Sequence, residues 1–314
     1  MNKIFEKKAH IALLLSFLAI IVAALAISIS QKKFLVSPIP KASSVTLSTD
    51  PFSNINLEAK AAFVVDLSDG KVLFEKNATT TYPLASLTKL ISIIVATDFL
   101  PAETKIEITP SDLLADGDTG LLPGENWSLE NLSRFTLITS SNDGITAIAR
   151  VAGVRVASPE NPDPNQAFLK AMDNTVAALG FSDMRFNNPS GLDVSSTTSG
   201  GYGSAKDIAG ILSYLLKVNP NLIAVTGEKT TTLRSDYASH TALNTDEVLP
   251  LIPSIVASKT GYTDLAGGNL AIIMDAGLMH PVALVVLGSS YDGRFSDMEK
   301  MAEATITSLN QKGI

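Results

Sequence analysis

Residues 83–99 read PLASLTKLISIIVATDF, and this stretch decides how the rest of the chain is interpreted. Ser86 and Lys89 form an S-x-x-K pattern at the start of a mostly apolar segment whose hydrophobic residues recur at helical spacing. We therefore predict a helix over Ser86–Phe99. The three-residue spacing places the hydroxyl and the amine on one helical face, with their Cβ atoms about 5 to 6 Å apart. A serine near a helix N-terminus can also turn its backbone N–H towards an oxyanion.

The S-x-x-K pattern occurs three times, at Ser30/Lys33, Ser68/Lys71 and Ser86/Lys89. Composition alone produces about one such match by chance. Ser30 lies at the end of an apolar run and Ser68 lies in a predicted turn, so only Ser86 begins an apolar helix. A capping serine with a lysine that extends to solvent is the alternative interpretation of that copy. The motif suggests a serine nucleophile with a lysine base, and other residues must support it.

Ser140-Ser141-Asn142 is the second motif, in a predicted break between two helices. Ser140 would pass protons between the lysine and a leaving group. Asn142 would hold a substrate carbonyl or the lysine. An ordinary turn with Asp143 as the helix N-cap is the alternative.

Lys259-Thr260-Gly261 is the third motif and ends a predicted strand. A second positive charge on Lys259 would make Lys89 easier to deprotonate, and Gly261 would let a substrate backbone approach the strand edge. The alternative is a charged strand end before a turn.

The remaining pattern indicates an α+β fold in which helices cover an antiparallel sheet of five strands, with a helical region inserted between the second and third strands. The expected strands are Ala61–Asp66, Lys71–Glu75, Ile255–Thr260, Asn269–Asp275 and Val282–Gly288. Besides the helix over Ser86–Phe99, the expected helices are Leu129–Ile138, Asp143–Val151, Ala167–Leu179, Ala205–Leu216 and a last helix from about Asp297 to Leu309. The glycine-rich segment at 200–203 is expected to be a flexible turn.

In this order, the three motifs form the signature of the penicilloyl-serine transferases. From about Leu57 to about Leu309 the chain resembles the D-alanyl-D-alanine carboxypeptidases, the low-molecular-weight penicillin-binding proteins. The segments that carry the resemblance are Pro83–Lys89, Ser140–Asp143, Phe186–Leu192, Asn244–Thr245, Lys259–Thr263 and Ala266–Gly267. The resemblance implies a fold like that of β-lactamases and transpeptidases, peptidoglycan stem peptide as substrate and β-lactams as covalent inhibitors.

The resemblance also implies a role for each site residue. Ser86 would attack the carbonyl between the two terminal D-alanines while Lys89 takes its proton, and Ser140 would protonate the departing D-alanine. Asn142 and Gly261 would contact the substrate or shape its site. Lys259 and Thr260 would orient the substrate carboxylate, and the backbone N–H of Tyr262 would join that of Ser86 in stabilising the oxyanion. No metal or organic cofactor is implied.

The sequence departs from the family pattern in two places at the site, and a third observation concerns the β-lactamases. Tyr262 stands where many relatives have histidine. No arginine comes directly after the strand ending in Gly288-Ser289-Ser290, where many relatives use one to bind the substrate carboxylate, and Arg294 cannot be aligned with that role. Glu160 does not have the spacing of the class A β-lactamase glutamate and is expected to be a solvated loop residue. A serine-type carboxypeptidase is therefore favoured, with an endopeptidase, a β-lactamase and a non-catalytic wall-binding module as alternatives.

Composition excludes several other functions. The 314 residues carry a net charge of −7, which argues against a partner with a phosphate backbone such as nucleic acid. The absence of cysteine excludes disulfides and cysteine nucleophiles. Among the three histidines, His240 and His280 are expected at the surface or in loops, with no G-x-S-x-G elbow to serve.

The N-terminus predicts the location of the protein. Ile11–Ile29 is an uncharged run of 19 residues, close to the length that crosses a bilayer core of roughly 30 Å. We expect a cytoplasmic N-terminus at residues 1–9, a membrane anchor or signal segment at 10–30, a linker at 31–56 and a DD-peptidase catalytic domain at 57–314. The catalytic domain would lie outside the bacterial cell membrane, or be secreted after signal cleavage.

Overall fold

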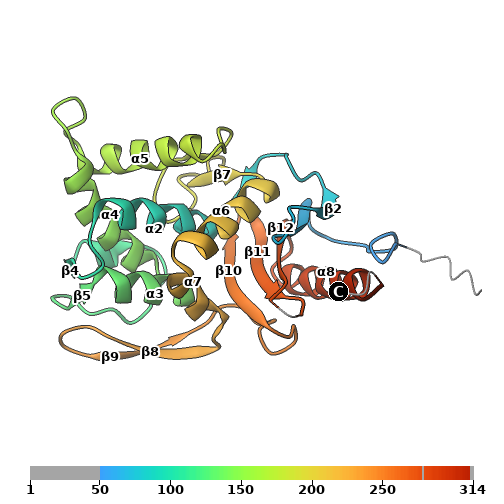
Figure 1. The fold of residues 1–314 in the computed structure, drawn as a ribbon. Helices are drawn as coiled ribbons and strands as arrows, with labels where there is room; N and C mark the ends of the chain where they lie inside the picture. Colours follow the sequence, from blue (N-terminus) through green and yellow to red (C-terminus); the bar gives the residue numbers. More distant parts are fainter. Residues whose placement is uncertain (1–49, 278, 312–314) are drawn as a thin grey trace, which may run out of the picture. The chain divides into compact units, whose positions relative to one another are not determined.

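The computed structural model describes residues 50–277 and 279–311 (Figure 1). The predicted N-terminus at 1–9, the predicted membrane segment at 10–30 and most of the predicted linker at 31–56 lie outside these residues. The described residues belong to one compact unit.

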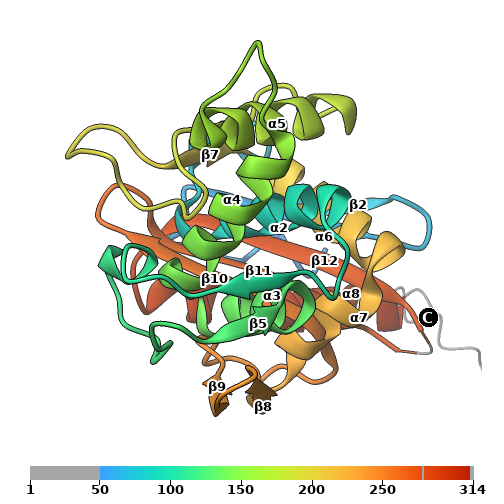
Figure 2. The same ribbon diagram turned by 90° about the vertical axis from the view of Figure 1, so that its left-hand side faces the viewer.

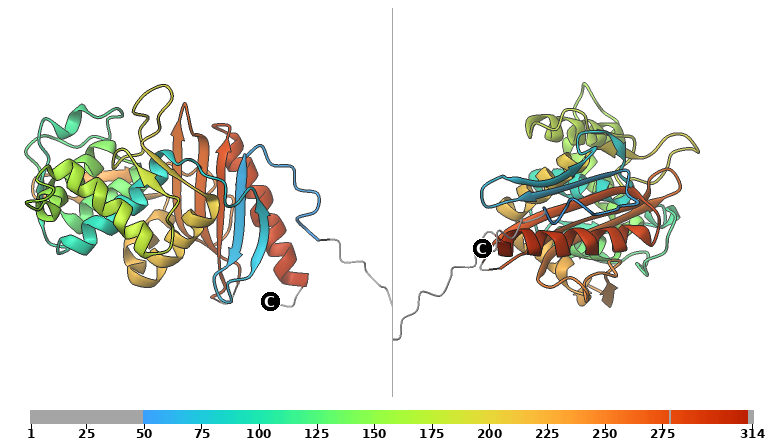
Figure 3. Two further views of the ribbon diagram at one scale, coloured as in Figure 1. Left: turned by 90° about the horizontal axis from the view of Figure 1, so that it is seen from above. Right: turned by 90° about the vertical axis from the view of Figure 1, so that its right-hand side faces the viewer.

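The predicted antiparallel sheet of five strands is confirmed, in the order β10-β11-β12-β1-β2. The two ends of the described chain therefore build one sheet, in which β1 lies between β12 and β2 (Figure 3). The strands are β1 Ala61–Asp66, β2 Val72–Lys76, β10 Ile255–Thr263, β11 Gly267–Asp275 and β12 Pro281–Ser289. The three C-terminal strands are longer than predicted, and β10 forms a free edge.

Alternating side chains of the sheet contribute to two separate hydrophobic cores. In β11, Leu270, Ile272 and Met274 pack in the core under α8 (Gly293–Gln311). Ala271 and Ile273 pack in the opposite core, among the other helices. This alternation results from the period of two in a β-strand.

Residues before β1 also pack on the α8 side of the sheet. Phe52 is buried and its ring stacks on Phe74, with centroids 5.3 Å apart. The packed part of the chain thus includes a residue that precedes the expected boundary at residue 57.

The predicted helical insertion is confirmed between β2 and β10 (Figure 2). Its predicted helices are α2 Thr88–Phe99, α3 Leu129–Thr139, α4 Asn142–Val156, α5 Pro164–Ala178 and α6 Ala205–Val218, and the short α7 Pro220–Ala224 was not predicted. The hydroxyl of Ser141 accepts a hydrogen bond from the Gly144 N–H, so Ser141 caps α4 in place of Asp143.

Within residues 50–277 and 279–311, no single helix is both long enough and apolar enough to cross a membrane. The segment Ala205–Val218 passes that test only together with Pro220–Gly227, and the two are bent by 116°.

Several short elements were not predicted. They are β3 Tyr82–Pro83, β4 Lys105–Glu107, β5 Asn126–Ser128, β6 Arg185–Phe186, β7 Gly201–Gly203, β8 Thr230–Arg234, β9 Ser239–Leu243 and the 3-10 helices η1 Ala85–Leu87, η2 Asp112–Leu114 and η3 Val225–Gly227. The prediction of a flexible turn at 200–203 was wrong for most of its length. Residues 201–203 form the strand β7, which pairs with β3 and β6.

His240, which was expected at the surface or in a loop, lies half-buried in β9, whereas His280 lies in the loop before β12, as expected. Nε2 of His240 lies 2.8 Å from Oε1 of the buried Glu125, and Nε2 of His280 lies 2.5 Å from Oδ2 of the buried Asp66. A buried carboxylate is costly without a partner, and each histidine supplies one. Both histidines are thus engaged away from Ser86.

Candidate active site

Ser86 lies in the 3-10 helix η1, and α2 begins only at Thr88. The prediction that the α-helix starts at Ser86 was therefore wrong by two residues. Ala85 has a φ of 48°, which is rare for a residue with a side chain. The chain thus makes a sharp bend at the residue just before Ser86.

Two glycines allow this bend to be packed closely. A Cβ on Gly191, whose φ is 83°, would lie 1.8 Å from the carbonyl oxygen of Ala85. A Cβ on Gly261 would lie 3.0 Å from the oxygen of Leu84 and 3.2 Å from the nitrogen of Ser86. The absent side chain of Gly261 thus makes room for the segment that carries Ser86.

Lys89 is fully buried beside the hydroxyl of Ser86. Its Nζ lies 2.7 Å from Ser86 Oγ, 2.7 Å from Asn142 Oδ1 and 2.9 Å from the carbonyl oxygen of Ser190. Burial, and then the positive charge of Lys259, hold the pKa of Lys89 well below its ordinary value. The structure therefore brings together Ser86, Lys89 and Asn142, which come from the first two motifs.

Lys259 joins the second and third motifs. Its Nζ donates to Ser140 Oγ at 2.9 Å and to the carbonyl oxygen of Thr260 at 2.8 Å. Burial, and then the charge of Arg294, lower the pKa of Lys259 to about 7, although Asp246 acts in the opposite direction. Because the charge of Lys259 lowers the pKa of Lys89, these two buried amines cannot both stay charged easily at neutral pH.

Ser140 and Asn142 are held by the link between α3 and α4. Ser140 has a left-handed backbone, with φ of 60°, at the C-terminus of α3, while Asn142 begins α4. The amide of Asn142 donates to the oxygen of Asp116 at 2.5 Å, which leaves its own oxygen facing Lys89. The turn thus presents a hydroxyl to Lys259 and an amide oxygen to Lys89.

Thr260 and Tyr262 lie further along β10. The hydroxyls of Thr260 and Thr245 are 2.5 Å apart. The ring of Tyr262 is 45% exposed and meets the ring of Tyr291 edge to face at a centroid distance of 5.0 Å. All eight predicted site residues therefore lie on three segments that converge here: η1 with the start of α2, the α3–α4 turn, and β10.

Sequence reasoning missed four residues that contribute to this arrangement. Ser190 and Thr245 lie in segments that carry the family resemblance, but no role could be assigned to them. Asp246 accepts a hydrogen bond from Ser258 next to Lys259, and Arg294 donates to the oxygen of Gly261 at 3.1 Å. The only signal for Arg294 was an arginine near the expected position of a carboxylate-binding residue.

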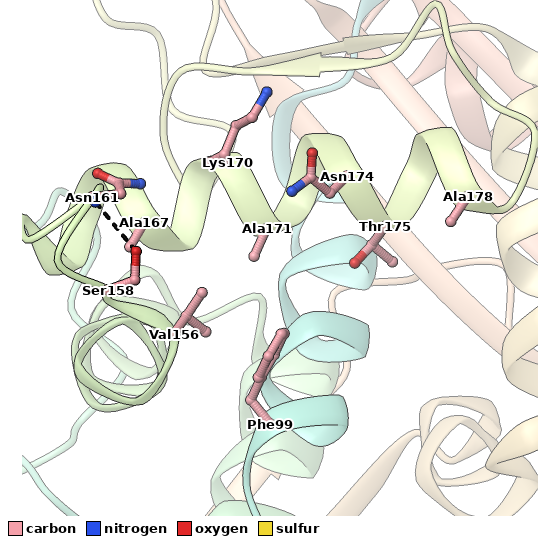
Figure 4. Close-up of a pocket in the computed structure, with 10 residues that line it drawn as sticks. All are labelled: Phe99, Val156, Ser158, Asn161, Ala167, Lys170, Ala171, Asn174, Thr175 and Ala178. Carbon is pink, nitrogen blue, oxygen red and sulfur yellow. Dashed lines mark hydrogen bonds between the residues drawn. The ribbon is translucent and has the colours of Figure 1, made fainter.

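A groove of about 380 Å³ lies elsewhere, between α5 and the ends of α2 and α4 (Figure 4). Phe99 and Val156 form part of its floor, and Lys170 and Asn174 lie along α5. It contains none of the predicted site residues. Among the described residues, no group of three His, Cys, Asp or Glu side chains is placed to hold a metal ion.

Known proteins share this fold. The penicillin-binding protein D2 from Listeria monocytogenes, solved in a cefotaxime-bound form, is 27% identical and matches with a TM-score of 0.65 over 80% of this chain and 98% of that one. A five-stranded sheet with an inserted helical region is thus the fold of penicillin-binding proteins and transpeptidases.

The sequence comparisons identify the family. The chain belongs to the D-alanyl-D-alanine carboxypeptidase family, whose family model matches residues 45–291. The D-alanyl-D-alanine carboxypeptidase DacF of Bacillus subtilis is 28% identical, over 80% of this chain and 63% of the relative. A D-alanyl-D-alanine endopeptidase of Pseudomonas aeruginosa is 27% identical, over 84% of this chain and 82% of the relative. The chain spans about three fifths of the length of several of the curated carboxypeptidases it matches.

Proposed function

We propose that this protein is a serine-type D-alanyl-D-alanine carboxypeptidase that removes the terminal D-alanine of peptidoglycan stem peptides. The observation that carries the proposal is the 2.7 Å distance between Lys89 Nζ and Ser86 Oγ, at a lysine with no exposed surface. A buried lysine with a lowered pKa can be neutral, and a neutral amine can accept the proton of a serine hydroxyl.

The other two contacts of Lys89 support this role. The oxygens of Asn142 and Ser190 are acceptors, so they occupy the two N–H groups of a neutral amine. The lone pair of that amine is then left for the hydroxyl proton of Ser86. Asn142 is thereby assigned to orienting the lysine.

Acylation would use these positions directly. Ser86 Oγ forms a bond to the carbonyl carbon between the two D-alanines, and its proton passes to Lys89. Backbone N–H groups of Ser86 and Tyr262 receive the negative charge that develops on the carbonyl oxygen. The C–N bond then breaks, and the proton that Lys89 took from Ser86 would pass through Ser140 to the D-alanine nitrogen, which returns Lys89 to its neutral form while Lys259 keeps its charge beside Ser140.

Deacylation would use water in place of the leaving amine. Water adds to the ester, the shortened peptide leaves as a carboxylic acid, and Ser86 regains its proton. Lys259 and Thr260 would orient the carboxylate of the substrate during both steps, because a protonated lysine and a hydroxyl at the strand edge suit an anion.

An endopeptidase that cleaves D-alanyl cross-links is the second candidate function. The relative from Pseudomonas aeruginosa carries that name and matches over 84% of this chain. The same residues would perform the chemistry, and the two activities differ in the group on the C-terminal side of the cleaved bond. A substrate with a free terminal D-alanine and one with a cross-linked D-alanine distinguish them.

A β-lactamase requires fast hydrolysis of the penicilloyl-enzyme. The carboxylate of Glu160 is exposed and accepts a hydrogen bond at 2.8 Å from Oγ of Ser158, which lines the groove in Figure 4. This placement supports slow deacylation. Rapid penicillin turnover that disappears in Glu160→Gln would favour the β-lactamase alternative.

We also propose that the protein is anchored in the bacterial cell membrane with its catalytic domain outside. The support is the uncharged run Ile11–Ile29. Fractionation of cells that express the full chain tests the proposal, since secretion after signal cleavage would place the protein in the soluble fraction.

Mass spectrometry of the purified chain tests the enzymatic function. Penicillin should add once, on a peptide that contains Ser86, and a peptide ending in D-Ala-D-Ala should lose one D-alanine. Ser86→Ala should lose both activities. Ser68→Ala is the matched control, because Ser68 belongs to another S-x-x-K copy, and it should keep both. An adduct on Ser30, Ser68 or Ser140, or no adduct at all, would refute the assignment.

A further inference from the structure

Arg294 is a buried cation beside β10, in the first turn of α8. It is 4% exposed, and its Nη1 donates to the carbonyl oxygen of Gly261 at 3.1 Å. Its guanidinium lies 4.3 Å from the ring centroid of Tyr291 and 4.6 Å from that of Phe295. Arg294 thus connects α8 with the K-T-G segment of the edge strand.

The charge of Arg294 is not accounted for by an ion pair. Within residues 50–277 and 279–311, no carboxylate forms a salt bridge with it, and its Nε has no hydrogen-bond partner. The carboxylates of Glu247 and Asp246 act on Arg294 electrostatically without forming a salt bridge. The cost of burying the charge is therefore only partly offset by opposite charge.

Direct binding of a substrate carboxylate does not fit the position of Arg294. The exposed rings beside it are those of Tyr262 and Tyr291, at 45% and 50%. Both rings lie within 6.0 Å of the guanidinium. The surface that a substrate meets here is aromatic, and the arginine reaches the site through the backbone of Gly261.

The peptide group between Gly261 and Tyr262 links Arg294 to the proposed oxyanion site. In a trans peptide the C=O and the N–H point in opposite directions. Arg294 lies on the β11 side of this peptide, because a Cβ on Gly268, the β11 partner of Tyr262, would lie 3.2 Å from the Arg294 Cβ. Since Arg294 contacts the Gly261 oxygen from that side, we infer that the N–H of Tyr262 faces the free edge of β10. The backbone of Ser86 lies there, against Gly261.

We propose that Arg294 is a positioning residue for acylation, which holds and polarises the Gly261–Tyr262 peptide so that the Tyr262 N–H becomes a better donor to the oxyanion. A cation on the carbonyl end of a peptide withdraws electrons from its N–H end and strengthens the bond that this N–H donates. This inference rests on the proposed serine peptidase function.

The positive charge of Arg294 also affects the protonation of Lys259 and, through it, of Lys89. After burial, its charge is the next cause that lowers the pKa of Lys259 to about 7, against the opposing effect of Asp246. Lys259 in turn lowers the pKa of Lys89. The guanidinium of Arg294 therefore acts on the proposed oxyanion donor, the Tyr262 N–H. Through Lys259 it also acts on the proposed base, Lys89.

Infrared spectroscopy of the penicilloyl-enzyme tests the proposal, together with the acylation rate. Arg294→Met removes the charge and keeps an apolar side chain, whereas Arg294→Lys keeps a charge. Arg185→Met is the matched control, because the Arg185 guanidinium also stacks on a tyrosine ring, at 4.3 Å from Tyr202, but away from β10. Rates are expressed per acylated site, so loss of folded protein does not lower them.

In Arg294→Met, acylation should be about tenfold slower or more, and the ester carbonyl band should move to higher wavenumber because its hydrogen bond is weaker. The acylation rate and the band position of Arg294→Lys should lie between those of Arg294→Met and the unaltered protein. Both quantities should be unchanged in Arg185→Met.

An unchanged rate and an unchanged carbonyl band in both Arg294 variants would overturn the inference, even if the melting temperature fell. A KM effect limited to peptides with a free terminal carboxylate, with the band unchanged, would also overturn it in favour of direct carboxylate binding. Failure of the proposed function is separate, since the unaltered protein would then form no penicilloyl ester.

Discussion

Lys89 and Lys259 are two buried amines with different surroundings. Lys89 contacts Ser86 and two acceptor oxygens, whereas Lys259 contacts Ser140 and lies near both Arg294 and Asp246. The proposed mechanism needs Lys89 neutral and Lys259 charged. Burial and the charge of Lys259 both lower the pKa of Lys89, whereas Asp246 opposes the lowering at Lys259, which favours that distribution.

Lys89→Arg should lose acylation although it keeps a positive charge. Arginine does not deprotonate near neutral pH, so no base remains for Ser86, and a reduction of about 10² to 10⁴-fold is expected. The rate of labelling by a fluorescent penicillin measures it. Lys170→Arg, on the exposed side of α5, is the control and should label normally. Acylation of Lys89→Arg at the unaltered rate would assign Lys89 a structural role.

The pH dependence of peptide hydrolysis should have two origins: KM should depend on the protonation of Lys259, and kcat on that of Lys89. The pKa of Lys259 is about 7, so Lys259 is protonated below that pH and loses its charge above it. Its attraction for the substrate carboxylate then falls, and KM should rise as the pH increases through 7. Lys89 must be neutral to act as base, so kcat should follow the lowered pKa of Lys89 and not that of Lys259.

Lys259→Arg provides the comparison, because its charge persists throughout this range. Its KM should be independent of pH across the neutral range, measured as D-alanine release from a D-Ala-D-Ala peptide. A rise in KM that survives in this variant would show that another group titrates.

At the scale of elements, the bend before Ser86 depends on how closely three segments approach. Gly191 and Ala85 both have positive φ, and their backbones touch. The sequence indicated Ser86 at a helix start, but periodicity carries no information about such a bend. The apolar pattern of residues 90–96 lies within α2 and does not show where the helix begins. The predicted start of the helix was therefore two residues too early.

Gly191→Ala should destabilise the protein by about 2 kcal/mol or more. The new Cβ would overlap the oxygen of Ala85, and the left-handed φ of 83° adds strain. Thermal unfolding measures the effect. Gly70→Ala is the matched control, with a φ of 76° and no atom within 4 Å of its added Cβ. It should lose less stability than Gly191→Ala, and equal losses would show that backbone strain alone is responsible.

The strands and helices that could be predicted are those with long apolar patterns. All five strands of the central sheet and most of the long helices fall within a few residues of their expected places. The hairpin of β8 and β9 was missed because its exposed threonines and serines give no alternating apolar signal. Pairings of two or three residues, such as β3 with β7, depend on distant contacts that no local pattern reveals.

At the scale of the whole molecule, Asp297 joins segments from both ends of the described chain. Its carboxylate accepts hydrogen bonds from the N–H groups of Glu58 and Ala59 at 3.0 and 2.8 Å, and from the hydroxyl of Ser289 at 2.8 Å. It is fully buried in α8. One side chain thus fastens the entry to β1, the end of β12 and the last helix.

Asp297→Ala should lower the free energy of unfolding by about 3 kcal/mol or more, because it leaves several buried donors without an acceptor. Denaturant unfolding measures the loss. Asp297→Asn keeps one acceptor oxygen and should be intermediate. Asp292→Ala, on an exposed residue of the preceding turn, is the control and should change stability little. A loss in Asp297→Ala no larger than that of the control would refute the role.

The motifs predicted which side chains meet, but not the residues that complete the site. Ser86, Lys89, Ser140 and Lys259 were identified because their spacing and order are specific. Ser190 contributes a backbone oxygen, which is independent of residue type and leaves no trace in a sequence. Arg294 acts across a peptide group of another strand, and only the packing of α8 shows it.

The closeness of Gly191 and Gly261 to the Ser86 segment has a practical consequence. Helical spacing alone brings the Ser86 hydroxyl near Lys89, but Lys89 contacts Ser190 and Lys259 contacts Ser140 only when pieces of chain separated by 101 and 119 residues have met. In a chain that has formed its helices but not these long-range contacts, Ser86 is an ordinary, unreactive serine. Under the proposed function, covalent penicillin labelling should therefore count only native molecules, and would give a direct assay of how completely a preparation has folded.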